Sequence, residues 1–341
     1  MRAIYFEKYN GPVVVKEIEV PYPAPNSVLI KVEATGLCRS DWHGYVGHDS
    51  DISLPHVPGH ELAGTVAQIG NQVKNFKVGD RVTVPFVNGC GKCQWCKSGN
   101  AQVCPEQTQP GFTQFGSFAE YVEIKNADFN LISLPNSISF EVAASLGCRF
   151  ATAFRGLTSR GGIRTNQLVA VFGCGGVGLS AIMIAKAFGA RVIAVDINQI
   201  ALDNAKSIGA DMAISAIDAV AEIQKHGGAD ISIDALGSQA TAEASVKSLR
   251  RLGRHIQLGL LLTEDGLTPM AMARVIAWEL EILGSHGMAA VDYPKLLEMV
   301  SNGQLNPELF IKRVIDLEAG TNALAEFNNS VQDGITIIKP N

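Results

Sequence analysis

The sequence lacks a strong excess of charge of either sign. Its 28 lysine and arginine residues face 33 aspartate and glutamate residues, which gives a net charge of −5 at pH 7. A protein that binds nucleic acid or an anionic membrane by electrostatic attraction needs a basic surface. We therefore expect no nucleic acid and no membrane among the partners of this protein.

Long apolar runs are also scarce. The N-terminal segment MRAIYFEKYNG carries charges where a signal peptide has its apolar core, so we expect a cytoplasmic protein. A mostly apolar, uncharged stretch, residues 168–185, is barely long enough to cross a bilayer and contains four glycines. We interpret it as a buried strand, a turn and a helix.

Cysteine occurs only seven times, and an odd number argues against a disulfide framework in a reducing compartment. Four of these residues follow the spacing C-x2-C-x2-C-x7-C, at Cys90, Cys93, Cys96 and Cys104. Four thiolates on one short loop can close a tetrahedron around Zn²⁺ and leave no open coordination position. We expect a structural zinc lobe over residues 89–105. An iron–sulfur cluster is the alternative, because the spacing resembles that of ferredoxins and Pro105 follows the last cysteine.

A chain of 341 residues is long enough for two domains. The pattern of predicted secondary structure changes near residue 150. Before that point, short runs rich in valine and isoleucine (27–34, 63–69 and 80–84) predict a mostly β domain. After it, strands alternate with helices, which is typical of a parallel α/β sheet. The predicted strands are 168–172, 191–195, 231–234 and 255–258, and the predicted helices are 177–188, 200–208 and 240–249. A helix over 293–301 and a strand over 335–338 are predicted near the C-terminus.

A glycine-rich turn follows the strand predicted at 168–172. The segment GCGGVG at 173–178 matches G-x-G-x-x-G, and Asp196 ends the next predicted strand. Such glycines permit a tight turn, close approach of a pyrophosphate and packing of the helix on the strand. Asp196 would accept hydrogen bonds from ribose hydroxyls and repel a 2′-phosphate, so NAD is favoured over NADP. A flavodoxin-like or methyltransferase sheet that binds another ligand is the alternative. The glycines concerned are Gly173, Gly175, Gly176 and Gly178.

A second group of polar residues precedes this region. The segment Cys38-Arg39-Ser40-Asp41-Trp42-His43 brings a thiol, a hydroxyl, a carboxylate and an imidazole together, and His60-Glu61 follows later. A catalytic zinc needs three protein ligands of mixed nitrogen and sulfur type and an open fourth position. Spacing alone does not join these residues, and an isolated cysteine such as Cys148 is more often a packing residue.

Over its whole length, the chain resembles the zinc-dependent medium-chain alcohol dehydrogenases. The resemblance rests on four features: CRSDWH at 38–43; GHELAGTVAQIGNQV at 59–73, which fits G-H-E-x-x-G-x5-G-x2-V; the four-cysteine lobe; and GCGGVG with Asp196. It implies a GroES-like catalytic domain over 1–150 and a Rossmann, doubly wound NAD-binding domain over 151–286. Residues 287–341 would return to the catalytic domain.

The resemblance also implies roles for individual residues. Cys38, His60 and Cys148 match the ligands of a catalytic zinc ion. Glu61 matches a carboxylate able to approach the metal, and Asp41 a residue that orients the histidine ligand. The other matches are Ser40 and His43 to a proton relay, Arg39 to a pyrophosphate contact, and Thr152 and Val177 to the nicotinamide pocket.

The implied protein is an NAD-linked enzyme with two zinc ions per chain, one catalytic and one structural. It would interconvert primary or secondary alcohols, aromatic ones included, with aldehydes or ketones, as a homo-oligomer for which a tetramer is favoured over a dimer. Cys148 favours simple alcohols, because polyol dehydrogenases of this superfamily usually place a carboxylate there. A polyol or amino-alcohol dehydrogenase of the same fold is the alternative, and a non-catalytic zinc protein is an alternative of another class.

The sequence departs from the family pattern at three places. Ala201 stands where relatives often have a lysine, and Met288-Ala289-Ala290 where many have an arginine that reaches the cofactor phosphates. Both departures lower the expected affinity for NAD, but they do not change the expected choice of NAD over NADP. Trp42 stands where smaller aliphatic residues are common in the family. Its side chain would either narrow the substrate site or pack beneath it, and the sequence favours neither alternative.

Overall fold

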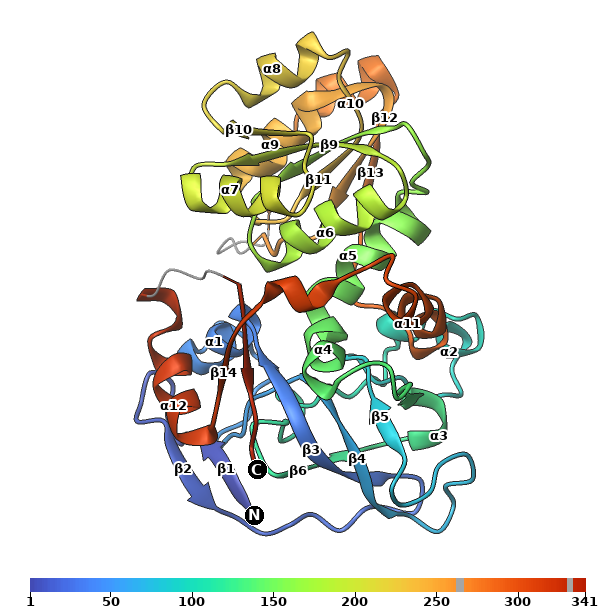
Figure 1. Ribbon diagram of the computed structural model, residues 1–341, viewed down its shortest axis with the longest axis vertical. Coiled ribbons are helices and arrows are strands. Elements are labelled where there is room, and N and C mark those ends of the chain that lie inside the picture. Colours follow the sequence, from blue (N-terminus) through green and yellow to red (C-terminus); the bar gives the residue numbers. More distant parts are fainter. Residues whose placement is uncertain (262–266, 330–333) are drawn as a thin grey trace. The chain divides into compact units, whose positions relative to one another are not determined.

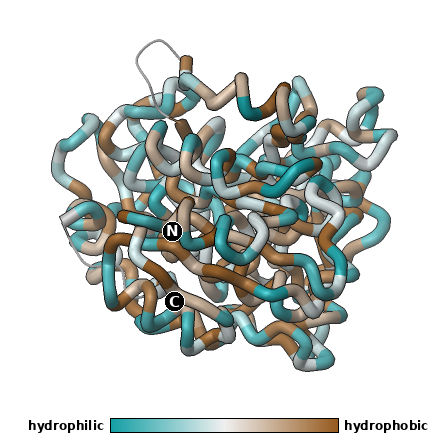
Figure 2. The backbone as a smooth tube through the Cα atoms, turned by 90° about the horizontal axis from the view of Figure 1, so that it is seen from above, coloured by the Kyte–Doolittle hydropathy of each residue, from teal (hydrophilic) through white to brown (hydrophobic). Residues whose placement is uncertain are grey.

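The structure is a computed structural model that describes residues 1–261, 267–329 and 334–341. These residues form two compact units, one comprising residues 1–151 and 287–341 and the other residues 152–286 (Figure 1). The hydropathy-coloured trace in Figure 2 has hydrophobic stretches inside and hydrophilic stretches in many outer loops. No helix in the described ranges has the length and apolarity needed to cross a bilayer.

The first unit is built on a seven-stranded sheet with the order β14-β15-β3-β4-β5-β7, in which β6 also pairs with β3. Neighbouring strands are antiparallel except for β14 and β15. The strands are β3 (Val28–Leu37), β4 (Glu61–Ile69), β5 (Arg81–Thr83), β6 (Tyr121–Ile124), β7 (Ile132–Ser133), β14 (Ile311–Ile315) and β15 (Ile335–Ile338). Val28, Ile30 and Val32 recur at every second position of β3 and pack into one buried core with side chains of β4 and β5. Two more strands, β1 (Arg2–Tyr5) and β2 (Val14–Glu17), form a separate antiparallel pair.

Short helices connect and flank the sheets of this unit. The α-helices are α1 (Arg39–Val46), α2 (Gln94–Lys97), α3 (Ala127–Asn130), α4 (Phe140–Ser145), α11 (Tyr293–Ser301) and α12 (Leu317–Ala325). A π-helical turn, η2 (Leu146–Phe150), continues α4, and 3₁₀ turns lie at η1 (Ala101–Val103), η4 (Ala290–Asp292), η5 (Pro307–Phe310) and η6 (Phe327–Asn329). Single π turns inside helices occur frequently at functional sites.

The second unit is a six-stranded parallel sheet with the order β10-β9-β8-β11-β12-β13. Its strands are β8 (Leu168–Phe172), β9 (Arg191–Asp196), β10 (Met212–Ser215), β11 (Ala229–Asp234), β12 (Leu249–Gln257) and β13 (Glu281–Gly284). Its helices are α5 (Ala151–Arg155, which begins at the last residue of the first unit), the π turn η3 (Gly156–Arg160), α6 (Gly176–Ala187), α7 (Gln199–Ser207), α8 (Ala219–Lys225), α9 (Gln239–Ser248) and α10 (Met272–Trp278). The strand order reverses between β8 and β11, as in doubly wound sheets that bind ligands at the carboxyl ends of their strands. The predicted α/β fold class is confirmed.

Several predicted elements have the predicted bounds. Strand 168–172, helix 293–301 and strand 335–338 correspond to β8, α11 and β15, and residues 168–185 form a strand, a turn and a helix. The prediction for strand 255–258 was wrong at its start, because β12 begins at Leu249. Arginines and Gly253 interrupt the apolar pattern there, and the β11–β12 pairing shifts its register at the same place. Sequence reasoning also missed β10, β13, α8 and α10.

Candidate functional site

Three segments of the first unit bring metal-binding side chains together. The register of β3 and β4 pairs Gly36 with Glu61, so Cys38 follows one strand and His60 precedes the other at the same end of the sheet. The turn η2 adds Cys148. Donor atoms of Cys38, His60, Glu61 and Cys148 all lie within 4.8 Å of one another. Residues that their spacing in the sequence could not assign to one site therefore form one cluster, in which all but the half-buried Cys148 are buried.

The His60 ring is oriented by Asp41. Its Nδ1 lies 2.8 Å from Asp41 Oδ1, and the same carboxylate accepts hydrogen bonds from the backbone N–H of Gly59 (3.1 Å) and of Cys38 (2.8 Å). Because an ionised carboxylate only accepts, Nδ1 carries a proton, which leaves Nε2 as the nitrogen available to a metal ion. His60 Nε2 is buried and has no hydrogen-bond partner among the described residues. A histidine fixed at one nitrogen and unpartnered at the other, beside two thiols, fits a metal ion.

The two thiols of the cluster differ in acidity. Their mutual hydrogen bond holds the pKa of Cys38 well below its usual range and raises that of Cys148, which burial raises further. Thiolate is the form that binds zinc. One ligand is therefore predisposed to the metal-binding form even without an ion.

Glu61 forms a buried ion pair that sequence reasoning missed. Its Oε1 accepts hydrogen bonds from Arg149 N (3.2 Å) and Nε (3.1 Å), and its Oε2 accepts one from Arg149 Nη2 (2.5 Å). Burial raises the pKa of Glu61, and the positive charge of Arg149 opposes that change. The available signal was an arginine within the apolar segment LGCRFATAF.

The predicted relay residues lie on α1. Ser40 Oγ is 3.9 Å from Cys38 Sγ, and His43 Nδ1 is 2.9 Å from His48 Nδ1. His48 was not predicted. Trp42 packs edge-on against both histidine rings. Arg39, the expected pyrophosphate contact, donates to Asn328 Oδ1 at 3.2 Å within the first unit.

The four remaining clustered cysteines form a separate site in the first unit. Their sulfur atoms all lie within 4.8 Å of one another, with Cys90 and Cys96 3.9 Å apart and Cys93 and Cys104 3.7 Å apart. A tetrahedron with Zn–S bonds of about 2.3 Å has sulfurs about 3.8 Å apart. None of these cysteines forms a disulfide. The separations therefore fit one four-coordinate ion.

The glycine turn of the second unit connects β8 to α6. Gly173 has a φ of +91°, and a Cβ at Gly178 would lie 1.8 Å from the carbonyl oxygen of Gly173. A Cβ at Gly175 would meet nothing within 4 Å, so the space above the helix N-terminus is open to a ligand. Gly176 and Val177 are the first residues of α6. These positions fit the pyrophosphate-binding turn of a dinucleotide fold.

Two other predicted cofactor contacts lie in the second unit. Asp196 ends β9, and its carboxylate accepts the backbone N–H of Cys174 (2.7 Å) and of Asn198 (2.9 Å). Thr152 is buried in α5. The Asp196 carboxylate is thus fixed at the end of the strand that follows the glycine turn.

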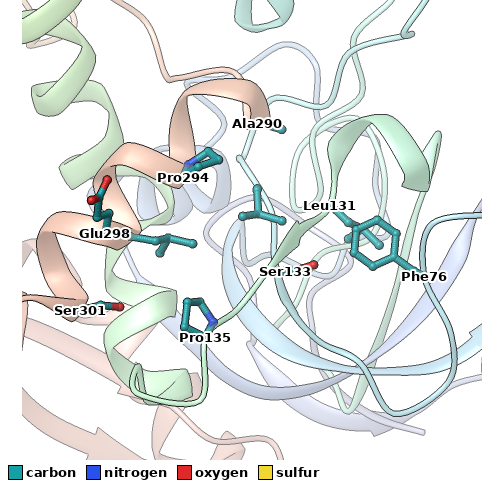
Figure 3. Close-up of a pocket in the computed structure, with 10 residues that line it drawn as sticks. Phe76, Leu131, Ser133, Pro135, Ala290, Pro294, Glu298 and Ser301 are labelled. Atoms are coloured by element: carbon teal, nitrogen blue, oxygen red, sulfur yellow. The ribbon is translucent and has the colours of Figure 1, made fainter.

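A hollow in the first unit lies beside α11 and β7, and the side chains around it are drawn in Figure 3. Phe76, Leu131, Pro135, Pro294 and Leu297 give it a largely apolar lining. None of the predicted site residues lines it, so we assign it no part in the chemistry.

The sequence matches two known domain families. Residues 24–136 match the alcohol dehydrogenase GroES-like domain, and residues 176–302 match the zinc-binding dehydrogenase family. The chain is 32% identical to an NAD-dependent alcohol dehydrogenase of Saccharolobus solfataricus over 100% of both chains. It is 33% identical to an alcohol dehydrogenase of Geobacillus stearothermophilus over 89% of this chain and 90% of that one.

Solved structures show the same relationship. An alcohol dehydrogenase from Thermus sp. ATN1 superimposes with a TM-score of 0.91 at 30% identity over 99% of both chains. A crystal structure of an NAD-dependent alcohol dehydrogenase gives a TM-score of 0.90 at 31% identity over the full length of both. Two matching domain families and full-length relatives lead to one conclusion: the chain belongs to the zinc-binding alcohol dehydrogenase family of medium-chain dehydrogenases.

Proposed function

We propose that this protein is a zinc-dependent, NAD-linked alcohol dehydrogenase. Its substrates are primary or secondary alcohols, aromatic ones included, which it interconverts with aldehydes or ketones. The observation that carries the proposal is the unpartnered, buried Nε2 of His60, which lies in one cluster with the thiols of Cys38 and Cys148. Three donors of mixed nitrogen and sulfur type are the ligand set of a catalytic zinc with an open position.

In this assignment, Cys38, His60 and Cys148 hold the catalytic ion, and the four-cysteine lobe holds a structural one. A zinc ion held by these residues would supply Lewis acidity, which would let an alcohol lose its proton near neutral pH. Asp41 keeps the imidazole of His60 in the orientation and protonation state that ligation requires.

The chain's own residues then move the proton. Ser40 Oγ, beside the thiol of Cys38, accepts the proton of the alcohol and passes it toward His43. Burial and the charge of His48 lower the pKa of His43, so its ring is neutral and able to accept a proton at pH 7. NAD, held by the second unit, would supply the acceptor for the hydride of the substrate carbon.

The cofactor is held by the second unit in this proposal. Gly173, Gly175, Gly176 and Gly178 allow the pyrophosphate to approach the start of α6, and Val177 and Thr152 contribute to the nicotinamide pocket. Asp196 binds the ribose hydroxyls and disfavours the 2′-phosphate of NADP. We place the NAD-binding domain at residues 151–286 and the catalytic domain at 1–150 with 287–341, and we propose a homo-oligomeric enzyme.

The test combines zinc stoichiometry with NADH formation from a panel of primary, secondary and aromatic alcohols, polyols and amino alcohols. We expect two zinc ions per chain and turnover of simple alcohols. Cys148→Ala should lose one zinc ion and the activity while keeping the ion of the four-cysteine lobe. One zinc ion per wild-type chain and no NADH from any alcohol would instead identify a non-catalytic zinc protein. Preferential turnover of polyols or amino alcohols would identify the alternative dehydrogenase.

A further inference from the structure

The carboxylate of Glu61 lies among the proposed zinc ligands, but its oxygens are already bound. One of its oxygens lies within 4.8 Å of donor atoms of Cys38, His60 and Cys148, which is within reach of a shared ion. Three N–H groups of Arg149, one from the backbone and two from the guanidinium, donate to the two oxygens of Glu61. Glu61 is fully buried and Arg149 is 8% exposed, so water does not compete for this pair.

Two glycines shape the space that the carboxylate fills. A Cβ at Gly36 would lie 2.3 Å from Glu61 Oε2, and a Cβ at Gly147 would lie 2.9 Å from Glu61 Cα. Any larger residue at either position would displace the glutamate. The backbone therefore leaves room for Glu61 in the position where it meets Arg149.

The position of this carboxylate decides whether the metal site is open or closed. Three protein ligands leave a fourth position for substrate, whereas a fourth protein ligand would occupy it. With zinc bound, Cys38, Cys148 and Glu61 carry three negative charges, and the ion and Arg149 carry three positive ones. Without Arg149, the buried excess negative charge would be relieved by direct binding of Glu61 to the metal.

We propose that Arg149 is a positioning residue that withholds the Glu61 carboxylate from the metal and thereby keeps the fourth coordination position open to substrate. The inference rests on the proposed metal site and adds to it a residue that controls access to the fourth coordination position. Residue 149 follows ligand 148 directly, so the turn η2 supplies both a metal ligand and the group that restrains a competing one.

The chemistry of arginine suits this role. A guanidinium is planar and always charged, and it binds a carboxylate through two parallel N–H groups. Lysine is a point charge on a flexible stem and fixes neither oxygen in a set direction. Arg149→Lys should therefore restrain Glu61 only in part.

The test uses the full-length protein loaded with Co²⁺ and titrated with imidazole, which binds an open metal position and changes the visible absorption of the ion. The four-thiolate lobe is closed and does not respond. Relative to wild type, Arg149→Met should retain its metal and bind imidazole roughly 10–100-fold more weakly, a typical size for loss of a group that positions a ligand. Arg149→Lys should be intermediate. The double variant Arg149→Met/Glu61→Gln should recover imidazole binding, because the competing carboxylate is gone.

A merely structural ion pair predicts a different pattern. Arg149→Met with full metal content and wild-type imidazole affinity would overturn the proposal, as would a double variant that binds imidazole as weakly as Arg149→Met. If Arg149→Met does not fold, Arg149→Lys is compared with the double variant Arg149→Lys/Glu61→Gln. The proposal then requires the double variant to bind imidazole more tightly than Arg149→Lys, and equal affinities would overturn it. A wild-type protein whose Co²⁺ spectrum ignores imidazole would refute the metal site itself, and the proposal with it.

Discussion

The Nδ1 atoms of His43 and His48 lie 2.9 Å apart at the end of helix α1. Gly47, with a φ of +86°, ends the helix and turns the chain so that His48 returns beside His43. In such a pair, one ring must donate its Nδ1–H and the other must accept. The two rings cannot both be doubly protonated without repulsion, and this electrostatic coupling lowers the pKa of His43.

This coupling predicts how the pKa of His43 responds to its neighbours. His48→Gln removes a positive charge and should raise the pKa of His43, and the acidic limb of the kcat profile should move to higher pH with it. Asp49→Asn removes a negative charge that raises the same pKa, so it should shift the value downward. NMR titration of the His43 ring measures both changes. Shifts in the same direction for the two variants would contradict the coupling.

Ser40→Ala should remove the first carrier of the proton. We expect kcat to fall by roughly 10²-fold or more, the usual contribution of a positioned acid–base group. Zinc content should stay at the wild-type value, because the hydroxyl belongs to neither proposed ligand set. Ser207→Ala, at an exposed end of α7, is the matched control and should leave kcat unchanged. Full activity in Ser40→Ala would remove this serine from the relay.

Cys96→Ser should remove one of the four thiolate ligands of the proposed structural zinc ion. Such sites contribute folding free energy directly, so we expect loss of one zinc ion per chain and a fall in Tm of more than about 5 °C. Cys174→Ala removes a buried thiol outside both clusters and should leave the zinc content unchanged. If Cys96→Ser instead keeps its stability and loses only turnover, the division between structural and catalytic sites is wrong.

Acid should destabilise the second unit through His255. This ring is fully buried, with Nδ1 2.9 Å from Ser245 Oγ and Nε2 3.1 Å from Gln257 Oε1, and burial lowers its pKa. The unfolded chain therefore binds a proton more readily than the folded one. The contribution of neutral His255 to the free energy of unfolding is fully present above about pH 7.5. It falls as the pH drops below about 6.5, by up to about 1.4 kcal/mol per pH unit.

His255→Gln should remove that share of the acid slope, measured by urea unfolding between about pH 7.5 and pH 5.5. Ser245→Ala is the control, because it removes a hydrogen-bond partner but keeps the titrating ring. It should lower stability across the range and retain the slope. An unchanged slope in His255→Gln would show that other groups govern acid stability.

Asp196→Asn should relax the choice of cofactor. The N–H groups of Cys174 and Asn198 donate to different oxygens of the carboxylate, so the amide keeps an acceptor for only one of them, and it removes the charge that would repel a 2′-phosphate. We expect the ratio of kcat/KM for NADP to that for NAD to rise roughly tenfold, which corresponds to about 1.4 kcal/mol. Asp203→Asn, in the helix α7 that follows Asp196 in the chain, should leave the ratio unchanged. An unchanged ratio in Asp196→Asn would mean that another group selects the cofactor.

Local pattern was enough to predict the elements whose residues are uniformly buried or clearly amphipathic. Every residue of β8 is buried, and α11 alternates buried and exposed faces, so both were predicted with the observed bounds. The missed strand β10 has no fully buried residue, and β12 contains three arginines and a glycine. Their strand conformation comes from pairing with neighbours, which is a tertiary effect that local pattern does not contain.

The distinction between local sequence pattern and tertiary contact also explains which residues of the site were predicted. Motifs and family resemblance identified Cys38, His60 and Cys148, which the structure brings into one cluster. They did not identify Arg149 or His48. Glu61 and Arg149 are 88 positions apart and meet only because η2 lies beside the start of β4. His48 meets His43 only through the left-handed turn at Gly47.

The carboxylate of Asp41 joins two properties that are usually adjusted separately. It begins helix α1 by accepting the N–H of Cys38, and it also sets the angle of the His60 ring. A substitution at position 41 therefore cannot retune metal selectivity while sparing the first turn of the helix, nor reshape that turn while sparing the metal. Engineering of the proposed metal site for another ion therefore has to leave Asp41 in place and work through Cys38 or Cys148.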